Sequence, residues 1–188
     1  MNKKLLTVLS LVLVVALVGG GIWFFTRPSD NLLVRQNLEN LSAKEIIDTL
    51  QTRPKSENKY NLVAGVKATE LELKDDQGSV TVPITEGFYL SVAPYIQMTH
   101  ECFNHSLTTC QGELVNEPIQ LKIFDTNGKT LFDQSVTTEA NGFYGVWLER
   151  DQQITVLATY KDYAGSVVTT TNADAPTCVT TLKLHEGV

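Results

Sequence analysis

The sequence predicts a mainly β protein of the α+β class, in which a short N-terminal helical part precedes an antiparallel β-sandwich. From residue 60 onward, short runs of alternating apolar and polar residues recur at even spacing, separated by turn residues. This rhythm resembles that of immunoglobulin-type modules. One capping box with an apolar stripe behind it predicts a helix ahead of the strands. The hydrophobic fraction of 43% is ordinary for a chain that buries a core.

The first 27 residues form the most apolar part of the chain. Lys3 and Lys4 precede an uncharged run of 21 residues, 5–25, and Arg27 follows it. As a helix, at about 1.5 Å per residue, this run would span roughly 32 Å, close to the hydrocarbon thickness of a bilayer. A cleaved signal peptide and an uncleaved anchor both fit, but a small-residue cleavage site of the A-x-A type is missing. We therefore expect residues 1–27 to anchor the chain in the bacterial cytoplasmic membrane with the remainder outside; cleavage would leave a secreted or periplasmic protein.

The part of the chain after the apolar segment is acidic. Residues 1–27 hold three of the 15 basic residues and none of the 21 acidic ones, which leaves 12 basic and 21 acidic residues and a net charge of −9. An acidic surface repels nucleic acid and anionic lipid but attracts cations. We therefore expect no nucleic-acid partner.

Residues 28–58 are expected to form a linker and a helical part. Ser42 and Glu45 have the spacing of a capping box, in which each side chain bonds the backbone N–H of the other. Pro54 lies just beyond the expected end of this helix. The residues of its apolar stripe are Ile46, Ile47 and Leu50. This stripe is expected to pack on the sheet or on another subunit.

Residues 59–188 are expected to form a β-rich domain. Pro94 interrupts one long apolar run, which favours an edge position or a strand end. Asn127-Gly128 lies between two runs and is typical of a type I′ hairpin. The expected strands cover residues 62–66, 71–73, 80–82, 88–96, 119–123, 131–136, 143–149, 153–160, 164–170 and 178–184.

A long loop, residues 97–117, carries the chemistry of the sequence. It contains the spacing H-x-C-x2-H-x4-C, formed by His100, Cys102, His105 and Cys110. Two of the three histidines and two of the three cysteines thus fall within eleven residues, which chance clustering does not explain. The third cysteine, Cys178, lies 68 residues after Cys110 at the start of the last expected strand, so only the fold can bring it to the loop.

Thiolate is a soft ligand and imidazole an intermediate one, so this set suits Cu(I) or Zn(II). A zinc module usually shows two closely spaced ligand pairs, and the distance to Cys178 therefore favours Cu(I). His105, flanked by both loop cysteines, is a stronger ligand candidate than His100. A redox role is also possible, because two thiols beside Cu(II) can reduce the metal and form a disulfide. Glu113 is expected either to support the ligands from outside the ligand set or to be a surface charge.

Other interpretations of these cysteines remain open. A disulfide between Cys102 and Cys110 would close a nine-residue loop and leave one spare thiol. Cys178 would then be a small buried apolar residue in an extracytoplasmic β-sandwich interaction module. A thiol oxidoreductase usually has C-x-x-C, which is absent. Phosphate-binding, G-x-S-x-G and H-E-x-x-H motifs are also absent, so we predict no catalytic residue.

Five stretches of the sequence resemble the CueP family of bacterial copper-resistance proteins, over residues 40–184. They read THECFNHSL (99–107), CQGEL (110–114), FYLSVAPY (88–95), NGFYGVWL (141–148) and TCVTTL (177–182). The resemblance implies copper binding outside the cytoplasm by the β-rich part of the chain, with the family's three cysteines at Cys102, Cys110 and Cys178. It leaves the histidine ligand as His105 or His100. It further implies protection against copper, delivery to a partner such as copper–zinc superoxide dismutase, and a homodimer. The anchor-like N-terminus departs from the soluble pattern of the family.

Overall fold

The N-terminal part of the structure, a computed structural model that describes residues 31–187, contains the predicted helix. Helix α3 (Ala43–Thr52) begins at the predicted capping box: the Ser42 hydroxyl accepts a hydrogen bond from Glu45 N, and the Glu45 carboxylate accepts one from Ser42 N. Its apolar stripe is buried, as expected. Two shorter helical elements accompany it, α2 (Leu32–Arg35) and the 3-10 turn η1 (Lys55–Glu57).

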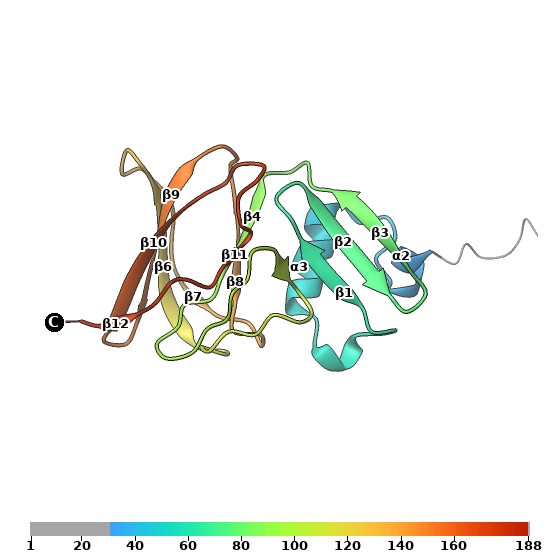
Figure 1. Cartoon of the computed structure of the whole chain (residues 1–188), viewed down its shortest axis with the longest axis horizontal. Coiled ribbons are helices and arrows are strands. Elements are labelled where there is room, and N and C mark those ends of the chain that lie inside the picture. Colours follow the sequence, from blue (N-terminus) through green and yellow to red (C-terminus); the bar gives the residue numbers. More distant parts are fainter. Residues whose placement is uncertain (1–30, 188) are drawn as a thin grey trace, which may run out of the picture.

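Twelve strands in the described part of the chain form three sheets (Figure 1). The first sheet has the order β3-β2-β1-β5, the second β12-β10-β9-β6-β7, and the third β11-β4-β8. The strands are β1 (Val63–Val66), β2 (Glu70–Asp75), β3 (Gly78–Pro83), β4 (Phe88–Val92), β5 (His105–Ser106), β6 (Pro118–Asp125), β7 (Thr130–Thr137), β8 (Tyr144–Leu148), β9 (Gln153–Tyr160), β10 (Tyr163–Thr170), β11 (Cys178–Val179) and β12 (His185–Glu186).

One apolar core lies between the helices and the first sheet. Leu71 and Leu73 alternate inward along β2 and meet Ile46 and Ile47 of helix α3, all fully buried. Alternation with period two is what places one side of a strand against a helix and the other in solvent. Figure 1 shows α3 lying along this sheet on the right of the molecule.

A second core fills the space between the five-stranded and three-stranded sheets, which form the predicted β-sandwich. Phe88, Leu90 and Val92 of β4 point into this core, and Tyr89 of the same strand packs with the first core. All five residues of β4 are buried for this reason. Strand β4 therefore separates the two cores.

The predicted fold class is confirmed, with differences in detail. Strand β11 runs parallel to β4, so one pairing departs from the antiparallel pattern. The long run at 88–96 ends at Val92, two residues before Pro94, which fits the expected strand end. The hairpin at Asn127-Gly128 exists, but only Gly128 has a positive φ (77°), so its turn is not the type I′ predicted, which needs positive φ at both residues.

The division of the chain into a linker and helical part, residues 28–58, and a β-rich domain, residues 59–188, remains a prediction. The expected anchor at residues 1–27 lies outside the described residues. Within residues 31–187, no helix is long and apolar enough to cross a membrane.

Candidate metal centre

Backbone pairing brings His105 and Cys178 together from segments 73 residues apart. Strand β5 adds to the edge of the first sheet, with His105 opposite Val66 of β1. The hydroxyl of Thr177 accepts a hydrogen bond from His105 N (3.0 Å) and donates one to the carbonyl of Val66. Thr177 is fully buried, so this hydroxyl fixes the start of β11 against both strands.

A second set of backbone contacts brings Cys102 to the same place. The carbonyl of Phe103 accepts hydrogen bonds from Thr177 N (3.0 Å) and Cys178 N (3.2 Å). Cys102, which precedes Phe103, and Cys178, which follows Thr177, therefore lie side by side. The central expectation of the sequence, that the last cysteine returns to the loop, is met by these contacts.

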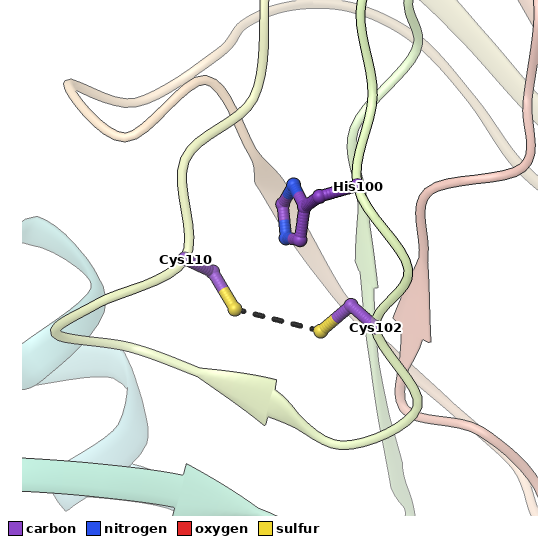
Figure 2. Close-up of side chains that lie close together, drawn as sticks. All are labelled: His100, Cys102 and Cys110. Atoms are coloured by element: carbon purple, nitrogen blue, oxygen red, sulfur yellow. Dashed lines mark hydrogen bonds between the residues drawn. The ribbon is translucent and has the colours of Figure 1, made fainter.

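The three sulfur atoms lie together. Cys102 and Cys178 form a disulfide, and Cys110 is a free, partly buried thiol. The Cys110 sulfur lies 3.5 Å from the Cys102 sulfur, and Figure 2 shows the two side chains pointing toward each other. A disulfide is thus confirmed, but the Cys102–Cys110 pairing is wrong, because the fold places Cys178 at bonding distance from Cys102 instead. Cys178 is buried without being an isolated apolar residue.

Burial controls the protonation state of the Cys110 thiol. Loss of hydration raises the pKa of Cys110, and the hydrogen bond from Ser106 N to its sulfur (3.3 Å) acts in the opposite direction. The protonated thiol is therefore the resting form at neutral pH. A bound soft cation would favour the thiolate, as metal ligation does for cysteine.

The two loop histidines occupy different environments. His105 is fully buried, with Nδ1 3.9 Å from the Cys178 sulfur and Nε2 3.2 Å from the side-chain oxygen of Gln51. Burial, with a smaller effect of His100, lowers the pKa of His105 to about 3. Its imidazole is therefore neutral at pH 7 and retains one lone pair for a metal. His100 is exposed and lies beside Cys102 and Cys110, as Figure 2 shows.

Two groups of potential metal ligands share the Cys110 thiol. One contains His100, Cys102 and Cys110, and the other His105, Cys110 and Cys178; within each group the ligand atoms lie within 4.8 Å of one another. All five residues singled out in the sequence thus come together. With the disulfide closed, only Cys110 offers a thiol, and reduction would free two more.

Phe143 forms an aromatic wall against both histidines. Its ring centre lies 4.6 Å from that of His105 and 6.3 Å from that of His100, and the side chain is fully buried. The turn before it packs tightly on the loop that carries Cys110: Gly112 N donates to Asn141 O at 2.6 Å, and a Cβ on Gly112 would lie 2.5 Å from the carbonyl oxygen of Gly142. This close approach explains the glycines at both positions.

Glu113 fixes the start of the loop, at residues 96–98. One of its carboxylate oxygens accepts hydrogen bonds from the backbone N–H groups of Ile96, Gln97 and Met98, at 2.9 to 3.0 Å. Burial by itself raises the pKa of Glu113, but the three N–H donors together outweigh it and lower the pKa overall. Glu113 is therefore a structural clamp three residues after Cys110.

An open cavity of about 490 Å³ gives access to the outer group. Its lining includes Tyr95, His100, Cys102 and Thr181. Phe103 and Met98 on the same loop are exposed, at 58% and 72%. The outer group thus faces solvent, whereas His105 and Cys178 lie behind it.

Sequence reasoning missed Gln51, Thr177 and Phe143 as parts of this centre. Thr177 and Phe143 fall in stretches that carry the family resemblance, which is the one signal that pointed to them. Gln51 sits in a helix 54 residues before the histidine it contacts, and no sequence pattern marked it.

Comparisons with known proteins point to one family. Residues 45–183 match the family model described as periplasmic copper-binding protein CueP. The crystal structure of S.CueP superimposes with a TM-score of 0.78 at 34% sequence identity, over 85% of this chain and 99% of that one. No curated protein matches this sequence. With three cysteines and two histidines assembled where two sheets meet, and a family match over most of its length, the chain belongs to the CueP family of periplasmic copper-binding proteins.

Proposed function

We propose that this chain binds copper as Cu(I) when its cysteines are reduced, through Cys102, Cys110, Cys178 and His105, with His100 as the ligand on the solvent side. The observation that carries the proposal is the convergence of three sulfur atoms and a neutral, buried imidazole. A soft, partly buried set of thiols and imidazole suits Cu(I) better than a hard cation that prefers carboxylate oxygens.

The disulfide supports a redox role for the same residues. Two thiols that become one disulfide release two electrons and two protons, so two Cu(II) ions are reduced to two Cu(I) ions. Closure of the Cys102–Cys178 bond still leaves the Cys110 thiol with His100 and His105 beside it. The oxidised form therefore keeps fewer soft ligands, and it is the form expected to hold copper weakly.

In the cell, this chemistry would sequester copper outside the cytoplasm and pass it on. The open side of the outer group, at His100 and the adjoining cavity, suits transfer to a copper-accepting enzyme such as copper–zinc superoxide dismutase. Residues 1–27 would hold the chain at the membrane, and residues 59–188 would carry the copper. A homodimer is part of the same proposal.

Competition with a coloured Cu(I) chelator under anaerobic conditions tests copper binding. Fully reduced protein is expected to take one Cu(I) per chain from the chelator, and oxidised protein to take much less. Serine at any one of the three cysteines should weaken binding, as should His105→Ala. His185→Ala is the matched control, because His185 is exposed on β12, outside both ligand groups.

The rival function, an interaction module with a structural disulfide, predicts a different result. In that case reduced protein would not compete with the chelator, and the cysteine variants would differ only in stability. If the reduced wild type binds Cu(I) no better than a variant with all three cysteines replaced, the copper proposal is contradicted.

A further inference from the structure

The side chain of Gln51, on helix α3, lies against the buried face of His105. We propose that Gln51 is a positioning residue, which holds His105 as the tautomer protonated on Nε2 and so keeps the Nδ1 lone pair directed at the sulfur atoms. The inference about copper affinity rests on the proposed function, whereas the inference about the tautomer does not. Four hydrogen bonds, which form three successive links, carry the argument.

The first link fixes the orientation of the Asn141 amide. Phe143 N donates a hydrogen bond to Asn141 Oδ1 at 3.0 Å. A backbone N–H has no lone pair to offer, so the atom that faces it must be the amide oxygen. Asn141 is buried, and the bond lies in the turn that packs on the cysteine loop. The side chain therefore presents an acceptor to its neighbours.

The second link fixes the orientation of the Gln51 amide. Its Nε2 lies 3.4 Å from Asn141 Oδ1, and a donor is required opposite that oxygen. The oxygen of Gln51 must then point the other way, toward Tyr89 and His105. Tyr89 donates its hydroxyl proton to this oxygen at 3.1 Å. Both ends of the amide are thus satisfied in one orientation and not in its flipped form.

The third link assigns the proton on His105. Its Nε2 lies 3.2 Å from the same oxygen of Gln51, which can only accept, so Nε2 carries the hydrogen. A neutral imidazole has one N–H, and Nδ1 is therefore left with a lone pair. That nitrogen lies 3.9 Å from the Cys178 sulfur. In the other tautomer an N–H would face the sulfur, a weak acceptor, while Nε2 and the Gln51 oxygen would set two lone pairs against each other.

The surroundings of Gln51 restrict its freedom to move. Helix α3 is anchored by buried Ile47 and Leu50, which lie one turn and one residue before Gln51. Tyr89 is itself buried, with its ring against the strand at Gly145, where the absence of a side chain leaves room for the hydroxyl. Partners outside the ligand set that orient a histidine in this way usually change metal affinity by about 10–100-fold when removed.

Nitrogen-15 NMR of the His105 ring, in protein without metal, tests the tautomer directly. We expect the Nε2-protonated pattern in the wild type, with His100→Ala and His185→Ala used to assign the three rings. An Nδ1-protonated His105 in the wild type would overturn the proposal. This measurement needs no variant at position 51 and no bound copper.

Variants at position 51 test the effect on copper. Gln51→Leu should lose the defined tautomer and weaken Cu(I) binding about 10–100-fold. Gln51→Glu keeps an acceptor oxygen for Tyr89 and His105, so Nε2 of His105 should stay protonated, but its second oxygen would face the acceptor oxygen of Asn141 and cost stability. Gln120→Leu is the matched control, since Gln120 also donates one side-chain hydrogen bond and accepts another, but on β6 with Asp133 and Ser135.

The outcomes separate the two claims. Wild-type affinity in Gln51→Leu would overturn the positioning role even if copper binding is real. No Cu(I) binding by the reduced wild type would overturn the proposed function, and the NMR result would still decide the tautomer.

Discussion

The Cys102–Cys178 disulfide and a bound Cu(I) ion should stabilise the same part of the fold by different means. The disulfide joins residues 76 apart in the sequence. The chain-entropy relation for a closed loop of that length gives a stabilisation of about 4.5 kcal/mol at 25 °C. Against a total of about 5–15 kcal/mol for a domain, reduction would remove between about a third and nine-tenths of the stability.

Bound Cu(I) should restore most of the stability that is lost when the disulfide is reduced. A ligand that binds only the folded state stabilises it by about 4.1 kcal/mol when its free concentration is about 1,000 times its Kd. Cu(I) at that level would therefore nearly replace the disulfide, because it joins the same cysteines once they are reduced.

Urea titrations of oxidised protein, reduced protein and reduced protein with Cu(I) would measure these free energies of unfolding. The double variant Cys102→Ser/Cys178→Ser should resemble the reduced wild type and gain little from Cu(I). Oxidised Cys110→Ser is the control, since it keeps the disulfide. If reduction leaves the free energy of unfolding unchanged, the cross-link argument is wrong. Equal stabilisation of the double variant by Cu(I) would refute shared ligands.

Two further predictions concern the stability of the fold. Asp75→Asn should cost about 3–5 kcal/mol, because it removes the charge of a buried carboxylate that the Arg35 guanidinium meets at 3.0 Å. Arg35 lowers the pKa of Asp75 against the opposing effect of burial, so this stabilisation is present above about pH 4 and is lost as pH falls through the lowered pKa; an acid titration of wild type and variant should converge. Gly145→Ala should cost about 1–3 kcal/mol, since its Cβ would overlap the Tyr89 hydroxyl and ring, whereas Gly65→Ala meets no atom within 4 Å and serves as its control. Thermal melts that rank the two alanine variants equally would contradict the overlap.

Local patterns in the sequence predicted much of the fold. The capping box at Ser42 and Glu45 has the predicted geometry, because a cap depends on residues three apart and on little else. Alternate residues of β6 and β9 are buried, as the predicted alternation of apolar and polar residues requires. The two-residue strand β5 was not predicted, since it forms only when Ser106 and its neighbour meet the edge of β1.

The candidate site was predictable in its residues and not in its connections. The clustering of rare residues around Cys102 marked the loop without any structure. The partner of Cys102 was not evident, because the choice between Cys110 and Cys178 depends on the buried Thr177 hydroxyl that fixes β11. Gln51 left no signal at all, since its role arises from packing between a helix and a distant strand.

X-ray absorption at the copper edge, on reduced protein with one equivalent of Cu(I), tests the central claim most directly. The account predicts a first shell dominated by sulfur with histidine nitrogen beside it, and a smaller sulfur contribution in Cys178→Ser. A shell of nitrogen and oxygen alone, or a spectrum unchanged when the Cys178 sulfur is removed, would contradict it.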